Sequence, residues 1–299
     1  MKRFILYGIL VLAAGNIFAQ QVADSIFSPI VSNPEYRIGR GPVITLDEAH
    51  FNFHTLEGRY KAFGDLLSKD GYKLQRGTKS FTLDYLRKTR ILAIANALAE
   101  NDNWRLPTRP AFARTEVDAV RKWVEEGGRL LLIADHMPCA GAAAELAAAF
   151  GFEFYNGFAM KRGMELFYRS KGNLLPTSIT DGRSGDESVD TIRVFTGQGF
   201  KVPSEAIIFT QLDSTYTIMM PDEAWEFNDS TRRVSGEGFA HGAYRKFGKG
   251  RVVMVAEAAM FSAQLAGPNA SKMGMNHPTA RNNPQLLLNI IHWLDGRID

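Results

Sequence analysis

Residues 43–55 read VITLDEAHFNFHT, an apolar run that changes abruptly into acids, an amide and two histidines. This pattern is typical of a buried strand whose carboxyl end carries polar side chains. His50, Asn52 and His54 alternate with phenylalanines, so an extended chain would place all three on one face. Imidazole and carboxylate groups arranged in this way could exchange protons with a ligand or coordinate a metal ion. A strand end with solvated acids and capping histidines fits this stretch equally well.

Polar residues also end three later apolar runs of the chain. The run over residues 90–98 carries Asn96, the run over residues 129–134 is followed by Asp135 and His136, and the run over residues 251–256 is followed by Glu257. A late loop adds Asn276 and His277. The carboxyl ends of parallel strands meet at one edge of a sheet, which is where ligands bind in open α/β folds. We therefore expect these side chains to line a single pocket.

Two kinds of role are expected within this pocket. The residues expected to take part in catalysis are His50, His136, Asp135 and Glu257. The residues expected to bind the ligand are Asp47, Glu48, Asn52, His54, Asn96, Asn276 and His277. Buried polar groups without partners cost about 1–3 kcal/mol each, so gathering many of them at one edge indicates a ligand, water or ion that uses them.

Three chemistries fit this set of residues. His50, His136 and His277 are candidate ligands of a divalent metal that would activate water, although their spacing matches no specific metal motif. The histidines and carboxylates could instead perform metal-free acid–base chemistry, or the site could only bind. We expect a hydrolase that acts on a small polar or carbohydrate-type substrate. The alternative is a non-catalytic module that binds a ligand or a partner.

The elements that must position these residues alternate between strands and helices. Helices are expected at residues 58–69, 82–88, 116–126 and 140–150, each following an expected strand. This alternation predicts a mostly parallel sheet with helices on both faces. Residues 157–245 are less regular and β-rich. A hairpin over residues 244–256 and a helix over residues 285–294 return the chain to the core.

The order of these elements resembles the class I glutamine amidotransferase-like superfamily. The segments ITLDEAHFNFHT, LLLIADHMPCAGAAAELAAAFGF and KGRVVMVAEAAMFSAQLAG are similar to an exported, uncharacterised branch of it. The resemblance covers roughly residues 41–296 and implies a flavodoxin-like α/β sheet with a less regular β-rich insertion.

The classical members of this superfamily carry a nucleophilic cysteine in a G-x-C-x-G turn and a His-x-Glu pair after a late strand. Here Met137 stands where the turn requires glycine, and Glu257 is followed by two alanines. We therefore do not expect a cysteine-dependent glutaminase, and we expect Cys139 to be structural.

The start of the chain predicts export. Lys2 and Arg3 precede an apolar run that ends near Ala14, and Ala19 suits a cleavage site, so residues 1–19 are an expected signal peptide. An extended arm over residues 20–40 and a single α/β domain over residues 41–299 would follow. We expect a periplasmic or secreted protein without stable membrane insertion after cleavage. Because 35 basic and 32 acidic residues nearly balance, no nucleic-acid partner is expected. Export, together with aromatic and amide residues near the expected pocket, indicates a small polar molecule or glycan as the partner.

Overall fold

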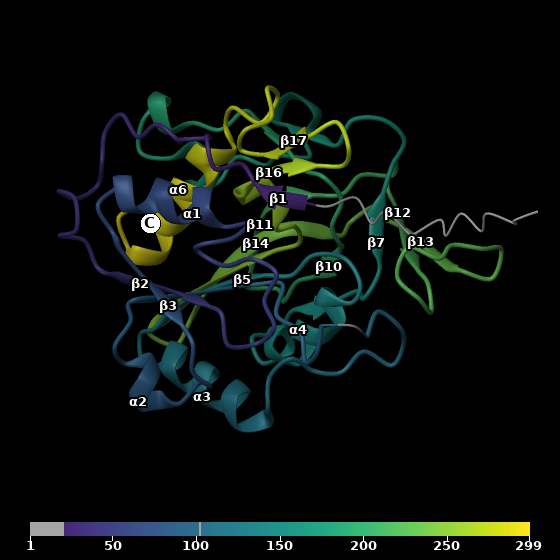
Figure 1. The fold of residues 1–299 in the computed structure, drawn as a ribbon, viewed down its shortest axis with the longest axis horizontal. Helices are drawn as coiled ribbons and strands as arrows, with labels where there is room; N and C mark the ends of the chain where they lie inside the picture. Colours follow the sequence, from purple (N-terminus) through teal and green to yellow (C-terminus); the bar gives the residue numbers. More distant parts are fainter. Residues whose placement is uncertain (1–20, 102) are drawn as a thin grey trace, which may run out of the picture.

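The fold is mixed α/β and is organised around one large sheet. The computed structural model describes residues 21–101 and 103–299, so the expected signal peptide lies outside the described residues. The large sheet has nine strands in the order β3-β2-β4-β5-β15-β14-β10-β6, and β11 pairs with β14 beside this path. Figure 1 labels several of these strands, among them β2, β5 and β14.

Five neighbouring strands form the parallel half of this sheet. They are β3 (Lys73–Gly77), β2 (Val43–Asp47), β4 (Ile91–Ala95), β5 (Arg129–Ile133) and β15 (Gly250–Val255). The strand order reverses between β2 and β4, because the chain first adds β3 on one side of β2 and then β4 and β5 on the other. In open α/β sheets a ligand binds beside such a reversal, at the carboxyl ends of the strands.

The other half of the sheet is antiparallel, which corrects the expectation of a mostly parallel sheet. It contains β14 (Ala240–Phe247), β10 (Phe200–Lys201), β6 (Glu153–Phe154) and β11 (Ile207–Gln211). The predicted hairpin is confirmed: β14 and β15 are joined through Gly248, whose φ of 55° suits glycine.

Smaller sheets surround the large one. The first contains β1 (Gln21–Ala23), β16 (Ala263–Ala266) and β17 (Ser271–Gly274). The second contains β7 (Phe158–Met160), β12 (Thr217–Met220) and β13 (Arg232–Ser235). The third pairs β8 (Leu166–Tyr168) with β9 (Thr191–Arg193). Short 3-10 turns lie at η1 (Arg169–Lys171), η2 (Gly185–Glu187) and η3 (Ala259–Phe261). The predicted β-rich, less regular part of the chain thus supplies most of the small strands.

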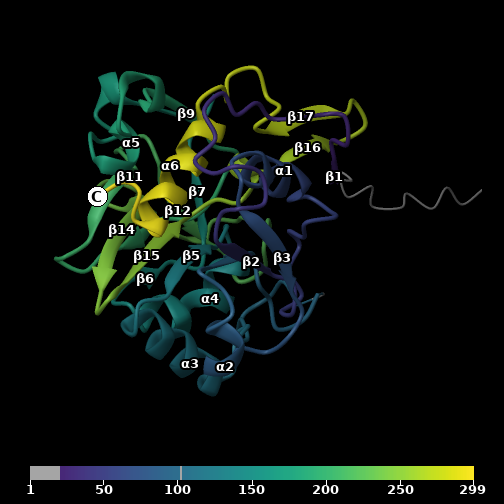
Figure 2. The ribbon, with the colours of Figure 1, turned by 90° about the vertical axis from the view of Figure 1, so that its left-hand side faces the viewer.

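Helices cover both faces of the large sheet, as Figures 1 and 2 show. One face carries α1 (Lys61–Lys69) and α6 (Asn283–Asp295), and the short α5 (Ser178–Asp181) packs beside α6. The other face carries α2 (Leu83–Leu86), α3 (Arg114–Glu125) and α4 (Cys139–Ala148). Within β5, Leu131 packs into the core beneath α1 and α6, whereas Leu130 and Leu132 pack into the core above α3 and α4. This alternation is what a strand buried on both faces requires.

No helix in the described ranges is long and apolar enough to cross a membrane.

Candidate functional site

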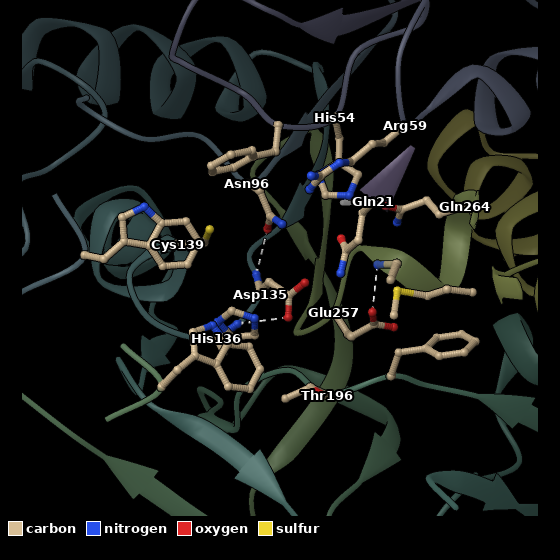
Figure 3. A pocket seen from close by; sticks show the side chains of 16 residues that line it. Gln21, His54, Arg59, Asn96, Asp135, His136, Cys139, Thr196, Glu257 and Gln264 are labelled. Carbon is tan, nitrogen blue, oxygen red and sulfur yellow. Dashed lines mark hydrogen bonds between the residues drawn. The ribbon is translucent and has the colours of Figure 1, made fainter. Parts of the chain in front are cut away.

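A pocket of about 540 Å³ lies where three parallel strands end. Asn96 follows β4, Asp135 follows β5 and Glu257 follows β15, and all three line the pocket. The chain after β2 adds His54 and Arg59 on another side, and Figure 3 shows these two side chains next to each other. The residues that end β4, β5 and β15 therefore line one cavity.

A chain of hydrogen bonds fixes the residues after β5. The side-chain oxygen of Asn96 accepts a bond from the backbone N–H of Asp135 at 2.9 Å. The Asp135 carboxylate accepts one from the backbone N–H of His136 at 3.0 Å. Nδ1 of His136 lies 2.8 Å from the carbonyl oxygen of Met137, which favours the tautomer with the proton on Nδ1, and in that tautomer Nε2 is an acceptor. Asp135 and His136 therefore both offer acceptors beside the pocket.

Glu257 is held in the pocket wall with almost no exposure to solvent. Its side chain is 1% exposed, and its two oxygens accept the backbone N–H groups of Ala259 and Met260 at 2.7 and 2.9 Å. Burial raises the pKa of Glu257 well above its usual range, and the negative charge of Asp135 raises it further, against the effect of the two N–H groups. Glu257 can therefore keep a proton at pH values where an exposed glutamate is ionised.

His54 is a buried imidazole without a partner. It is 3% exposed, and neither ring nitrogen has a hydrogen-bond partner among the described residues. Burial lowers the pKa of His54 to about 3, and the charge of Arg59 acts in the same direction. The ring is therefore neutral at physiological pH and offers one donor and one acceptor.

The backbone of the pocket wall adopts conformations that residues with side chains rarely take. Asn96, Thr196 and Trp225 have φ angles of 49°, 121° and 70°, and they are three of the five described non-glycine residues with positive φ. Such conformations cost roughly 1–3 kcal/mol each and concentrate at functional sites. Trp225 is 50% exposed and its ring lies edge-on to His136, with centroids 4.7 Å apart.

The structure places His50 outside the pocket, which corrects its assignment as a catalytic group and a metal ligand. Its Nδ1 lies 2.9 and 3.0 Å from the two Asp47 oxygens, and its Nε2 lies 3.0 Å from Oε1 of Glu116. Asn52 donates a bond to the same Asp47 carboxylate. Ile44 and Leu46 of β2 face α1 and α6, so strand alternation turns Asp47 to the opposite face, where α3 provides Glu116. His50 and His136 consequently share no ligand.

Three other predicted ligand-binding residues also have partners elsewhere. The Glu48 carboxylate accepts bonds from the backbone of Leu56 and from Arg76, Asn276 donates to Asp24, and His277 bonds Thr279 through Nδ1. None of the three lines the pocket, so their assignment to it was wrong. His277 comes nearest, because its ring packs edge-on against Phe195 of the pocket wall.

The predicted metal site does not form. Within the described ranges, no three His, Cys, Asp or Glu side chains are grouped so that they could hold a metal ion. His50 is enclosed by carboxylates, His136 is in the pocket and His277 is bound to Thr279, so the three proposed ligands are separated.

Sequence reasoning missed three lining residues that matter for the chemistry, namely Arg59, Thr196 and Trp225. Thr196 and Trp225 lie in the irregular part of the chain, where no periodicity indicates which side chains meet. Arg59 precedes α1 as an isolated arginine and carries no motif.

Comparison with known proteins supports the fold only. No family model matches the chain, and no curated protein matches its sequence. The structure is similar to the mmIFT52 N-terminal domain, with a TM-score of 0.58 and 12% identity, covering 84% of this chain and 96% of that one. It is also similar to a ThuA-like protein from Bacteroides uniformis ATCC 8492, with a TM-score of 0.45 and 12% identity over 89% of this chain and 94% of that one.

Two further similar structures come from Salmonella typhimurium. The cytoplasmic protein STM1381 from Salmonella typhimurium LT2 has a TM-score of 0.48 and 11% identity, over 85% of this chain and 97% of its own. A second similar structure, STM3548 from Salmonella typhimurium, is also described as a cytoplasmic protein. Both descriptions differ from the periplasmic or secreted location that the sequence led us to expect, and that expectation is not carried further.

Proposed function

We propose that the pocket is the active site of a hydrolase that acts on a small polar or carbohydrate-type substrate. The observation that carries this proposal is the pair of carboxyl groups, Asp135 and Glu257, in different surroundings within one pocket. Glu257 is buried and its pKa is raised, whereas Asp135 is half-buried and lies beside His136. Paired carboxyl groups in contrasting environments are the usual means of separating an acid from a base.

The proposed reaction uses protein groups alone. Asp135 accepts a proton from a water molecule while the oxygen of that water attacks the substrate. Glu257 gives its proton to the leaving oxygen as the bond to that oxygen breaks. Nε2 of His136 accepts a hydrogen bond from a substrate hydroxyl, and Asn96 fixes the backbone of Asp135. The proton on Asp135 then returns to Glu257 through solvent, which restores both groups.

We also propose that the chain belongs to the class I glutamine amidotransferase-like superfamily without using its cysteine chemistry. The strand order and the similar segments support membership. Burial raises the pKa of Cys139 well above its usual range, so the thiol stays protonated and is a poor nucleophile.

The test measures hydrolysis of a panel of nitrophenyl glycosides and nitrophenyl esters by the purified chain. Asp135→Asn and Glu257→Gln should each lower kcat about 10²- to 10⁴-fold, the usual contribution of a general acid or base. Glu145→Gln, which changes an exposed carboxylate on α4, is the matched control and should match the wild type. The wild-type rate should fall as pH rises through the raised pKa of Glu257, because the proton donor is lost. Full activity in either pocket variant would refute the proposed mechanism.

The second candidate function is binding without turnover. It is favoured by the aromatic side chains that line the pocket, namely Phe53, Trp104, Phe195 and Trp225, since flat rings suit contact with a sugar face. Ligand binding that shifts the melting temperature, with no product detected by NMR after prolonged incubation, would favour this function over hydrolysis.

A further inference from the structure

We propose that the substrate of this pocket is a sugar-like molecule with a single negative charge on a carboxylate. The guanidinium of Arg59 binds this carboxylate, and a ring N–H of His54 donates a further hydrogen bond to it. The inference rests on the proposed function for the identity of the pocket as a substrate site. It adds the charge of the substrate and the residues that recognise that charge.

Arg59 has the position and the unused hydrogen-bonding capacity that a carboxylate needs. It is half-buried in the pocket wall and is the single Lys or Arg among the residues that line the pocket. Its guanidinium lies over the ring of Phe53, 5.4 Å from the centroid, and makes no hydrogen bond or ion pair with any described residue. A planar guanidinium binds a carboxylate through two parallel bonds, which makes it suited to this task.

His54 provides a second and independent indication. Its ring is more than nine-tenths buried, lines the same pocket beside Arg59, and has no partner for either nitrogen. A polar group buried in this way is costly unless something in the pocket bonds to it. A neutral imidazole adds one N–H donor without adding charge, and this donor complements an oxygen held by Arg59.

The charges in the pocket favour a carboxylate over a phosphate. Arg59 interacts with Asp135 through space, but the two side chains form no ion pair. One guanidinium balances the single charge of a carboxylate. A phosphate monoester would bring up to two charges near Asp135, and no second Lys or Arg among the lining residues is present to balance them. The aromatic rings that line the pocket suit contact with the uncharged part of a sugar acid.

The experiment compares matched ligands by isothermal titration calorimetry. Glucuronate, galacturonate and mannuronate are each titrated beside the parent neutral sugar and beside glucose 6-phosphate. The wild type should bind at least one acid about tenfold or more tightly than its parent sugar and more tightly than the phosphate. In Arg59→Met this ratio of affinities should fall to about one, and in Arg59→Lys it should recover in part. Arg109→Met, which changes an exposed arginine that pairs with Glu100, is the matched control and should keep the wild-type ratio.

Three results would overturn the inference. Equal affinity for acids and parent sugars, or no measurable affinity for any of the acids, would show that the charge is not recognised. Tighter binding of glucose 6-phosphate than of the sugar acids would refute the claim that the substrate is a monoanion. If Arg59→Met lost the same factor of affinity for the acids and for the neutral sugars, Arg59 would only hold Asp135 in place and would not bind the carboxylate.

The two proposals fail separately. Hydrolysis of neutral glycosides without preference for the acids would refute the inference and leave the hydrolase in place. Acid binding through Arg59 with no turnover of any substrate would refute the hydrolase and leave the inference in place.

Discussion

At the residue scale, Cys139 shows how burial removes reactivity from a group placed beside a pocket. The side chain is 3% exposed and packs with Leu98 and Ala142 where α4 begins. Burial and the nearby charge of Asp135 raise the pKa of the thiol. A thiolate is the nucleophilic form, so this residue contributes packing and no covalent chemistry.

Cys139→Ala should therefore lower the free energy of unfolding by about 1 kcal/mol and leave turnover or ligand affinity close to the wild type. Urea denaturation measures the first quantity, and the nitrophenyl panel or calorimetry measures the second. Reaction of one equivalent of iodoacetamide that abolishes turnover of the native protein would contradict the structural role.

The sequence predicts individual pocket residues well where a strand end fixes them. Asn96, Asp135, His136 and Glu257 line the pocket because their strands are parallel neighbours. The failures have physical causes of their own. His50 matches the composition of a site, but side-chain alternation along β2 directs its partner Asp47 to the other face of the sheet, and no motif indicates that Glu116 will bind the second nitrogen.

At the scale of elements, the pairing of His50 joins the end of β2 to the start of α3. Burial lowers the pKa of His50, but the hydrogen bonds and charges of Asp47 and Glu116 outweigh this effect and raise it overall. Burial raises the pKa of Glu116, whereas the N–H groups of Ala113 and Phe81 and the bond to His50 lower it overall. A protonated His50 between two carboxylates therefore ties the strand to the helix.

His50→Gln should destabilise the chain by about 3–5 kcal/mol, because it leaves buried carboxylates without their cation. The loss should depend on pH. The pKa of His50 is raised in the folded state, so His50 contributes its full stabilisation of the fold at pH values below the histidine pKa of the unfolded chain, about 6.5. This contribution disappears as the pH rises through the pKa of His50 in the folded state. Urea denaturation of both proteins from pH 5.5 to 9 should show the difference shrinking with pH. A difference that stays constant or grows would contradict a charged His50.

The same element shows the limit of local capping rules. The sequence predicted a helix over residues 116–126, but α3 begins at Arg114, and the Glu116 carboxylate accepts the backbone N–H of Ala113 at 3.0 Å. Glu116 has a second role with His50, and that contact joins segments 66 positions apart. The antiparallel half of the sheet was predicted only in part. The hairpin that contains β14 was expected, whereas β10 and β6 have two residues each and are too short to show a periodicity.

At the scale of the whole molecule, two buried histidines contribute to the response of the fold to acid. Burial lowers the pKa of His54 and of His241 to about 3. An unfolded histidine binds a proton near pH 6.5, so acid favours the unfolded chain between that value and the folded pKa. Each of these residues contributes stability above pH 6.5 that is lost as the pH falls towards 3.

His241→Leu should make the fold less sensitive to acid, because it removes one of these protonation sites from the core. Between pH 6 and pH 4 the free energy of unfolding of the wild type should fall more steeply than that of the variant, by about 1.4 kcal/mol per pH unit. Urea denaturation at three or more pH values in this range provides the slopes. Parallel slopes would mean that His241 is protonated in the folded protein or neutral in both states.

The order of strands in the large sheet has a consequence for synthesis on the ribosome. The four strands β3, β2, β4 and β5 are complete once residue 133 has emerged, but the neighbour that covers β5 begins only at Gly250. Until then β5 offers an open edge whose residues Leu130 to Ile133 are apolar. Exposed edges of this kind recruit other chains or chaperones. The nascent protein therefore depends on protection of one strand through about two-fifths of its translation. A chain truncated before β15 should aggregate where the full chain remains dispersed.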